Sequence, residues 1–359
     1  MKKIVVGFMV AMSLAITGWT QPLAENIILV TLDGLRWQEV FKGVDTALLN
    51  DARFTRNKKG LQEMFGGASL AQSREKLMPF LWKEVATHGV ILGNRALGSL
   101  VNNANPYWFS YPGYNELLTG YADTAVNSND KKYNSNITVL EALHSQPAFK
   151  GKIAAFATWD VFPYIINAPR SGIPVNAGMD AFPALSPTLT MLSDMQKLAP
   201  QPIGVRPDVI TYFAAREYLK VKKPRVLYIA FDETDDYAHS GMYHEYLKAA
   251  HAEDAMIADL WNLIQSMPAY KNKTTLIITT DHGRGDALKE QWKDHGTRIA
   301  DASEVWIAAL GPGIKNGGEA GIKGQFKQGQ LAATIAYLLG QAYKPAHQPL
   351  PAIQEMLTQ

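Results

Sequence analysis

Residues 26–34 read NIILVTLDG, a short apolar run rich in β-branched residues that ends abruptly in an acid and a glycine. Two later segments have the same form: residues 225–236, RVLYIAFDETDD, and residues 274–283, TTLIITTDHG. Continuous apolar runs of this length are typical of strands that are buried on both faces, as in parallel sheets. We therefore predict three buried parallel strands, each followed directly by acidic residues.

The segments around these runs predict the rest of the fold class. Fainter strand patterns lie at residues 89–92 and 152–157, and helical patterns lie at residues 77–87, 209–220 and 246–267. Such alternation predicts an α/β fold, with a mostly parallel central sheet covered by helices on both faces. Ligands of these sheets bind beyond the carboxyl ends of the strands. The three acidic clusters are therefore expected at one edge of the sheet.

Histidines accompany the acids that follow the strands. A single Asp at a strand end often only caps the next helix, but several carboxylates that converge would repel one another unless a cation lay between them. Carboxylate and imidazole groups are the ligands expected for Zn²⁺ or Mn²⁺. Six side chains, enough for two ions, are the candidate ligands: Asp33, Asp235, His239, Asp281, His282 and His295.

Residues 109–120 read FSYPGYNELLTG, which is typical of a loop that enters a helix and of the glycine that ends it. Taken alone, Ser110 would be interpreted as the cap of this helix. Beside a metal site, however, the N-terminus of the helix would attract phosphate through its free N–H groups. A serine hydroxyl next to a cation also loses its proton more easily. We therefore predict that Ser110 is a nucleophile.

The first 24 residues resemble a secretory signal peptide: Lys2 and Lys3 precede an apolar stretch at residues 4–16, followed by small and polar residues. An uncleaved anchor is the alternative, but the apolar stretch is short for a membrane span. Two imperfect cleavage sites lie at residues 18–20 and 22–24. We expect a periplasmic or secreted protein whose residues 25–359 form one catalytic domain.

Charge and cysteine content narrow the function further. Without the first 24 residues, 33 basic residues balance 33 acidic ones. This balance gives no support for binding to nucleic acid or to an anionic membrane. The chain has no cysteine, which excludes disulfides, a cysteine nucleophile and a thiolate metal site, and which suits a bacterial periplasm. The oligomeric state is not indicated.

Five motifs can now be considered together. They are Leu32-Asp33-Gly34, Ser110-x-Pro112, Asp235-x-x-x-His239, Asp281-His282-Gly283 and His295-Gly296. In order and spacing, from about residue 26 to 340, they resemble the alkaline phosphatase superfamily, most closely its nucleotide pyrophosphatase/phosphodiesterase (type I phosphodiesterase) branch. The resemblance implies a three-layer α/β/α sandwich. A stretch rich in Pro, Ala and Met within residues 160–207 is expected to form a small cap or lid.

The resemblance also implies a ligand set and a reaction. Asp235, His239 and His295 would hold one zinc ion, and Asp33, Asp281, His282 and the Ser110 oxygen would hold the other, with manganese as the alternative metal. Ser110 would attack phosphorus in line and form a phosphoserine, which is then hydrolysed. The expected function is therefore an exported two-metal phosphoesterase that acts on small-molecule phosphate monoesters or diesters, such as a nucleotide or an aryl ester.

The chain departs from this branch at several positions. The branch usually has threonine where Ser110 stands. Either Asn127 or Asn129 would take the place of its phosphate-binding asparagine. Residues 158–160, Thr-Trp-Asp, lack the basic pair that monoesterases use, and Arg170 is the candidate replacement. The choice between monoesters and diesters therefore stays open.

Aromatic residues surround the predicted nucleophile at residues 107–109, Tyr111 and Tyr114. They would either stack on a nucleobase or an aryl leaving group, or pack as core beneath the helix.

Three other functions compete with a phosphoesterase. Ser110-Tyr111-Pro112 resembles the start of the sulfatase formylglycine motif, but Tyr114 stands where that motif needs arginine. A cofactor-independent phosphoglycerate mutase shares the fold and uses a metal-bound serine, but it is cytoplasmic. A non-catalytic protein that binds phosphate esters would not need Ser110.

Overall fold

The computed structural model describes residues 22–198, 205–319 and 321–358. The predicted signal segment lies outside these ranges except for its last three residues. Of these, Ala24 is buried, and its N–H donates to the Leu338 carbonyl at 2.9 Å, so Ala24 is part of the folded body. Among the described residues, we find no helix that is both long and apolar enough to cross a bilayer.

The centre of the molecule is a seven-stranded sheet with the order β2-β9-β7-β1-β6-β4-β5. Its strands are β1 (Asn26–Leu32), β2 (Gly89–Leu92), β4 (Ile153–Ala157), β5 (Val175–Ala177), β6 (Val226–Phe231), β7 (Thr274–Thr279) and β9 (Ile307–Leu310). Only β9 runs antiparallel to its neighbours, β2 and β7. The predicted mostly parallel sheet is therefore confirmed, as are the five strands expected from the sequence.

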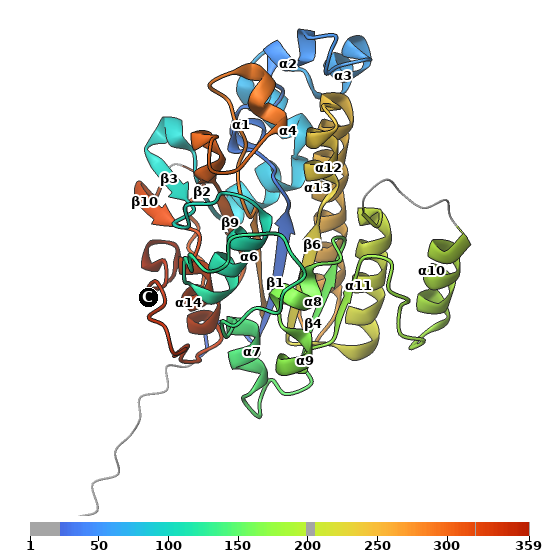
Figure 1. The fold of residues 1–359 in the computed structure, drawn as a ribbon, viewed down its shortest axis with the longest axis vertical. Helices are drawn as coiled ribbons and strands as arrows, with labels where there is room; N and C mark the ends of the chain where they lie inside the picture. The colour runs from blue at the N-terminus through green and yellow to red at the C-terminus, as the bar shows by residue number, and fades with distance from the viewer. Residues whose placement is uncertain (1–21, 199–204, 320, 359) are drawn as a thin grey trace, which may run out of the picture.

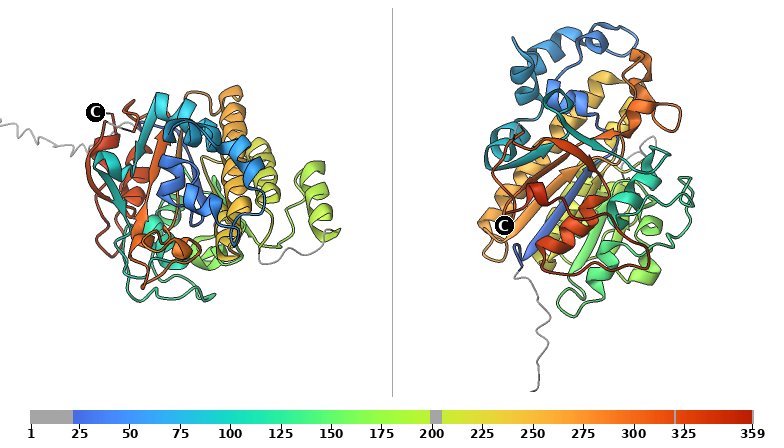
Figure 2. Two further views of the ribbon diagram at one scale, coloured as in Figure 1. Left: turned by 90° about the horizontal axis from the view of Figure 1, so that it is seen from above. Right: turned by 90° about the vertical axis from the view of Figure 1, so that its left-hand side faces the viewer.

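Side chains of β1 alternate between two hydrophobic cores, one on each face of the sheet. Ile28, Val30 and Leu32 belong to the first core, and Ile27 and Leu29 belong to the second. Figure 1 shows α11 and α13 on one side of β1 and α6 and α14 on the other, and the view from above in Figure 2 shows the same two layers. The predicted three-layer α/β/α sandwich is confirmed.

The helices that contribute to the first core are α1 (Trp37–Lys42), α2 (Thr46–Asn50), α3 (Lys58–Phe65), α4 (Leu70–Leu77), α10 (Pro187–Leu198), α11 (Asp208–Lys222), α12 (Glu233–His239) and α13 (Tyr243–Ser266). Those that contribute to the second core are α6 (Ser110–Thr119), α7 (Val139–His144), α8 (Phe162–Ile165) and α14 (Gln330–Leu338). Two short helices are α5 (Ala86–His88) and α9 (Ala168–Ser171).

Smaller elements complete the fold. A second sheet has the order β10-β3-β8, formed by β10 (Gly324–Lys327), β3 (Ser99–Asn102) and β8 (Glu304–Val305). A π-helical turn spans Leu81–Val85, and 3₁₀ turns span Arg95–Leu97, Lys289–Lys293, Ala300–Ser303 and Gln354–Met356. The sequence patterns did not predict this second sheet, because its strands are short.

The helical pattern at residues 77–87 is divided into three elements. Helix α4 ends at Leu77, the π-helical turn begins at Leu81, and α5 begins at Ala86. Pro79 explains the break, because proline lacks an N–H donor and disfavours helical backbone at the residue before it. Met78 accordingly leaves the helical region, with φ −129° and ψ 71°.

Residues 160–207, predicted to contain a cap, contribute a strand to the central sheet and a helix at the periphery of the molecule. Strand β5 pairs with β4 at the edge of the central sheet. Helix α10 lies at the periphery of the molecule next to α11 (Figure 1). Residues 199–204, within the same region, lie outside the described ranges. A lid function for this region stays a prediction.

The register of the central strands brings the predicted acids together. Strand β1 lies between β6 and β7, with Leu32 opposite Phe231 and Thr31 opposite Thr279. All three strands are parallel and end at the same level, so the residues that follow them meet at one edge of the sheet.

A buried acid far from this edge provides a test of the fold. Asp254 on α13 accepts the N–H groups of Phe80 at 2.8 Å and Leu81 at 3.0 Å. Burial outweighs these bonds and raises the pKa of Asp254 to about 7. A carboxyl group whose pKa is raised by folding stabilises the protein at low pH, and this contribution is lost as pH rises through the folded-state pKa.

The variant Asp254→Asn should therefore gain stability relative to wild type as the pH rises from 5 to 8, by on the order of a few kcal/mol. Thermal unfolding followed by circular dichroism at both pH values measures this difference. Asp194→Asn, at an exposed position, is the matched control and should show little change. A constant difference between Asp254→Asn and wild type would contradict the prediction.

Candidate active site

Two buried carboxylates after neighbouring strands each have one engaged oxygen and one free oxygen. Asp33 Oδ2 accepts the Tyr114 hydroxyl at 2.8 Å, and Asp281 Oδ1 accepts the Gly34 N–H at 3.1 Å. Asp33 Oδ1 and Asp281 Oδ2 have no hydrogen-bond partner, although both side chains are almost completely buried. Buried polar atoms without partners are uncommon and costly, so these two oxygens are candidates for ligating a cation.

The ring of His282 lies between these free oxygens and the predicted nucleophile. Its Nδ1 contacts the Gly283 carbonyl at 2.9 Å, which leaves Nε2 facing the site. Nε2 lies 3.4 Å from Asp33 Oδ1, 3.4 Å from Asp281 Oδ2 and 3.4 Å from Ser110 Oγ. Ligands of a tetrahedral zinc ion, at their usual bond lengths, are about 3.3–3.6 Å apart. The three distances from His282 Nε2 therefore match the spacing between ligands in a metal coordination shell.

Ser110 is the first residue of α6, and its hydroxyl does not cap the helix. Phe109 occupies the N-cap position, without a side-chain capping bond. Ser110 is 5 % exposed, and its Oγ faces His282. The interpretation of Ser110 as a helix cap is therefore wrong, and the hydroxyl is left available at the positive end of a helix.

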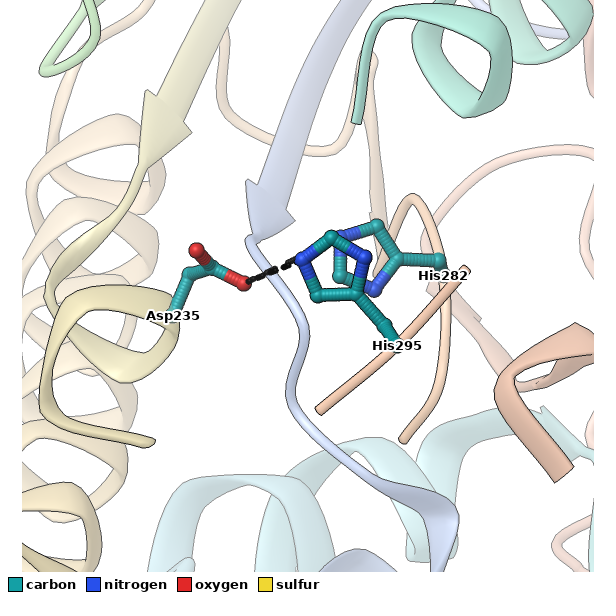
Figure 3. A group of neighbouring side chains, drawn as sticks. All are labelled: Asp235, His282 and His295. Atoms are coloured by element: carbon teal, nitrogen blue, oxygen red, sulfur yellow. Dashed lines mark ion pairs between the residues drawn. The ribbon is translucent and has the colours of Figure 1, made fainter. Parts of the chain in front are cut away.

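A second group of ligand atoms lies beside the first. On α12, Asp235 Oδ2 lies 3.2 Å from His239 Nε2, which lies 2.8 Å from His295 Nε2. Asp235 Oδ1 is 3.8 Å from the Nε2 atoms of both His295 and His282. Figure 3 shows the Asp235 carboxylate directed toward the rings of His282 and His295. Because His282 Nε2 is closer to Asp33 and Asp281 than to Asp235, we assign it to the first group.

Two contacts from distant segments position this second group. The first N–H groups around α12, those of Asp232 and Glu233, both donate to the Asp208 carboxylate at 3.0 Å. The loop of His295 is attached to the nucleophile loop, since the Gly296 N–H donates to the Trp108 carbonyl at 2.9 Å. Trp108 adopts a left-handed backbone, with φ 52°, a conformation uncommon for a tryptophan. The sequence patterns did not point to this contact.

The electrostatics of the two groups differ. Burial, followed by the charge of Asp33, raises the pKa of Asp281 to about 8. Burial opposes the charged form of His282, but the Asp281 and Asp33 carboxylates outweigh it and raise the pKa of His282 to about 9. In the second group, burial followed by the charge of His282 lowers the pKa of both His239 and His295, which keeps these rings in the neutral form that binds metal.

The residues present thus fit two divalent cations. The predicted ligands converge from strand ends that are far apart in sequence. Two triads, Asp33–Asp281–His282 and Asp235–His282–His295, each offer ligand atoms within 4.8 Å of one another, and His239 lies against the second triad. The predicted roles of these residues stay predictions, whereas their proximity is a property of the fold.

Arg284 is a component of the site that the sequence patterns did not indicate. Its side chain is completely buried, and Nη2 contacts both the backbone carbonyl and Oδ1 of Asp235. Nε donates to the Gly34 carbonyl at 3.1 Å, and Nη1 donates to the Lys293 carbonyl at 2.8 Å. Burial lowers the pKa of Arg284 to about 9, so the guanidinium remains charged at neutral pH.

Tyr111 and Tyr114 pack in the core, so the expectation that they bind substrate by stacking is wrong and the alternative of core packing holds. Tyr111 is 3 % exposed, and its hydroxyl donates to the carbonyls of Lys132 at 2.6 Å and Tyr164 at 3.1 Å. Tyr114 is completely buried, and its hydroxyl holds Asp33. Burial and then the charges of Asp281 and Asp33 raise the pKa of Tyr114, so this hydroxyl remains a donor.

The structure distinguishes the two candidate asparagines. Asn129 Oδ1 accepts the N–H of Tyr111 at 2.9 Å, so this side chain lies at the N-terminus of α6 beside Ser110. Asn127 instead lines a cavity of about 200 Å³, together with Tyr111 and Tyr133. Of the two, Asn129 is therefore the one next to the predicted nucleophile.

Arg170 lies at the wrong end of the sheet for the predicted role. It belongs to α9, which precedes the start of the parallel strand β5 and therefore lies toward the edge where the strands begin (Figure 1). Its guanidinium is engaged by Glu141 at 2.8 Å and by two backbone carbonyls. After β4, Asp160 pairs instead with Lys131 at 2.6 Å. Strand direction, which the spacing of residues did not reveal, explains the error.

Comparison with known proteins agrees with the predicted branch. Residues 103–333 match the family model for type I phosphodiesterase / nucleotide pyrophosphatase. Among curated proteins, no match to the chain was found.

Solved structures share the fold at low sequence identity. Alkaline phosphatase PafA has a TM-score of 0.62 and 10 % identity, over 94 % of this chain and 100 % of PafA. An inactive variant of murine ectonucleotide pyrophosphatase/phosphodiesterase 5, in complex with AMP, has a TM-score of 0.54 and 14 % identity, over 93 % and 100 % of the two chains. The 2-O GAG sulfatase BT1596 has a TM-score of 0.52 and 16 % identity, over 92 % and 73 %.

A substitution at Gly113 tests whether the close approach of α6 to the Asp281 backbone positions Ser110. A Cβ atom built there would lie 2.4 Å from the Asp281 carbonyl oxygen. Gly113→Ala should therefore displace α6 and Ser110 from the carboxylates, even though alanine favours helices. Because catalysis depends on the exact position of the nucleophile, this displacement is expected to lower kcat/KM for a chromogenic phosphate ester by about 100-fold.

The matched control is Gly317→Ala, because a Cβ atom at Gly317 meets nothing closer than a Val90 methyl group at 3.8 Å. This control should retain wild-type kinetics. An unchanged kcat/KM in Gly113→Ala would contradict the prediction, because it would show that the added methyl group does not displace Ser110 from its working position.

Proposed function

Since the chain belongs to the type I phosphodiesterase / nucleotide pyrophosphatase family, we propose that it is a two-cation hydrolase of small phosphate esters with Ser110 as its nucleophile. The observation that carries this proposal is the convergence of Asp33 Oδ1, Asp281 Oδ2 and Ser110 Oγ on His282 Nε2, each at 3.4 Å. No arrangement of serine, histidine and aspartate as a proton-relay triad is needed if cations activate the serine.

The proposed ligands divide into two sets. Asp33, Asp281, His282 and the Ser110 oxygen would hold one ion, and Asp235, His239 and His295 would hold the other. Zinc is the proposed metal, with manganese as the alternative. Two such ions would favour the deprotonated form of Ser110 and offset the negative charge of the phosphate.

The protein's own groups would orient the reaction. The N-terminus of α6 faces the same space as Ser110 Oγ, so its partial positive charge would attract the phosphoryl group. Ser110 Oγ would attack phosphorus as one ester oxygen departs on the opposite side, which releases an alcohol and leaves the phosphoryl group on Ser110, with its second ester group still attached when the substrate is a diester. Water would then attack this phosphorus, release phosphate from a monoester or a phosphate monoester from a diester, and regenerate Ser110.

We propose Asn129 as the side chain that binds a phosphoryl oxygen. Its Oδ1 is engaged by the N–H of Tyr111, so its Nδ2 is the group left to donate beside Ser110. The amide would thus add a neutral donor to the helix N-terminus.

The charges after β4 favour phosphodiesters over monoesters. Thr158 Oγ1 is engaged by Asp208 and Thr211 in the first turn of α11. Asp160 adds a negative charge that Lys131 neutralises. The absence of a free basic pair at residues 158–160 suits a phosphate that carries one negative charge better than a phosphate that carries two.

The alternatives have less support. A formylglycine-type sulfatase would need arginine at position 114, where the buried Tyr114 hydroxyl instead holds Asp33. A phosphomutase or a non-catalytic binding protein has no feature of this chain in its favour beyond the shared fold. We further propose that the N-terminal segment directs export, so that the enzyme acts in the periplasm or outside the cell.

A substrate panel with a nucleophile variant tests the proposed reaction. The zinc-loaded protein should hydrolyse bis-p-nitrophenyl phosphate with a higher kcat/KM than p-nitrophenyl phosphate or p-nitrophenyl sulfate. Ser110→Ala should lower kcat by about 1,000-fold or more, because the covalent step is lost, while zinc still binds.

Ser145→Ala, whose hydroxyl only contacts the Ala142 carbonyl, is the control and should keep full activity. A higher kcat/KM for p-nitrophenyl sulfate than for both phosphate esters would favour the sulfatase instead. Full activity in Ser110→Ala would remove the proposed nucleophile.

Metal dependence is tested by chelation. Dialysis against EDTA should abolish hydrolysis, because the carboxylates of Asp33 and Asp281 have no lysine or arginine of the described residues to balance them. Addition of Zn²⁺ should restore it, and elemental analysis of the restored protein should find about two ions per chain. Activity that survives exhaustive chelation with no bound metal would contradict the proposed chemistry.

A further inference from the structure

The two groups of ligands differ in formal charge. Asp33 and Asp281 give the first group two carboxylates, and no lysine or arginine side chain makes an ion pair with either among the described residues. The second group has one carboxylate, Asp235, and the buried Arg284 already contacts it. When the imidazoles are in the neutral form that ligates a metal, the first group carries a formal charge of about −2, whereas the second group together with Arg284 is close to neutral.

This difference in charge rests on the ligand sets of the proposed function. We propose that the two positions bind their cations with unequal affinity, and that Arg284 is the cause. The Asp33–Asp281–His282 position binds its ion tightly. The Asp235–His239–His295 position binds its ion weakly, since Arg284 repels the incoming dication and competes for Asp235. The weak position is then the one whose occupancy follows the free zinc concentration.

The other contacts of the Arg284 guanidinium fix its position against Asp235. All three guanidinium nitrogens are engaged, by the Gly34 and Lys293 carbonyls and by Asp235. Gly34 adopts φ +59°, and a Cβ atom built there would lie 2.8 Å from Arg284 Nε, Arg284 Nη2 and Asp235 Oδ1. Only glycine leaves room for the guanidinium and the carboxylate to meet at this place.

The ligand geometry agrees with the charges. In the first group, the distances from His282 Nε2 to its three neighbours are uniform, at 3.4 Å. In the second group, the distances from His295 Nε2 are 2.8 Å to His239 and 3.8 Å to Asp235 Oδ1. His239 is also 44 % exposed, whereas His282 is completely buried. The second position is therefore less regular and more accessible to solvent, and its ion is the one expected to exchange.

Zinc binding to the metal-free full-length protein tests this inference without relying on activity. Titration with Zn²⁺ against a competing chelator should resolve two ions per chain, with dissociation constants that differ by more than about tenfold. His295→Ala should remove the weak ion and leave the tight one. Asp281→Asn should weaken the tight ion.

Charge-altering variants then identify the cause. Arg284→Gln should tighten the weak ion by about tenfold or more and leave the tight ion unchanged, because the repelling charge is gone. Arg284→Lys retains the charge and should keep the wild-type ratio. Arg206→Gln is the matched control, since Arg206 is also completely buried but contacts Thr211, Asn176 and the Ala157 carbonyl; it should keep the wild-type ratio as well.

The outcomes separate this inference from the proposed function. Two zinc ions of equal affinity, or a weak ion that Arg284→Gln weakens further, would overturn the inference and leave the two-cation hydrolase standing. A wild-type protein that binds no zinc, or only one ion at millimolar zinc, would overturn the proposed function itself. If Arg284→Gln does not fold, His295→Ala and Asp281→Asn still decide which position is weak, and loss of the tight ion in His295→Ala would refute the assignment.

Discussion

The carboxylates of Asp33 and Asp281 lie in the interior against one imidazole, and no arginine or lysine in the described residues forms an ion pair with them. Holding two buried acids this close is unfavourable unless protons or cations compensate them. The two central strands β1 and β7 bring the acids together, because the strands are adjacent and parallel and end at the same level, with Thr31 opposite Thr279. The large apolar cores on both faces of the sheet stabilise this arrangement, which the acids alone would oppose.

The rest of the site depends on that constraint. Helix α6 is placed so that Ser110 Oγ lies 3.4 Å from His282, and the glycine at position 113 lets the helix approach the Asp281 backbone closely. The Tyr114 hydroxyl, one turn along the same helix, engages one oxygen of Asp33 and leaves the other free. A single helix thus orients the predicted nucleophile and one of the acids proposed to hold a cation beside it. Its N-terminus also adds a partial positive charge where a phosphate would bind.

At this edge of the sheet, the negative charges of the carboxylates differ in how the protein compensates them, as Arg284 shows. No arginine or lysine of the described residues compensates Asp33 and Asp281, whereas at Asp235 the protein supplies a permanent cation of its own, Arg284. A permanent cation stabilises the folded chain without metal but opposes the binding of metal at that position. This balance between the stability of the metal-free protein and the affinity for metal follows from where one buried guanidinium lies.

Sequence alone was enough to predict the α/β class, the three central strands, and the six acids and histidines with Ser110 that the structure brings together. Apolar runs that stop abruptly at an acid reveal both a buried strand and its end, so these features are local. The antiparallel strand β9, the choice of Asn129 over Asn127, the core positions of Tyr111 and Tyr114, and the error at Arg170 were decided by the tertiary structure. Each depends on strand direction or on contacts between segments far apart in the chain. The contact of Arg284 with Asp235 is of the same kind, because no pattern along the chain shows which carboxylate a buried arginine will meet.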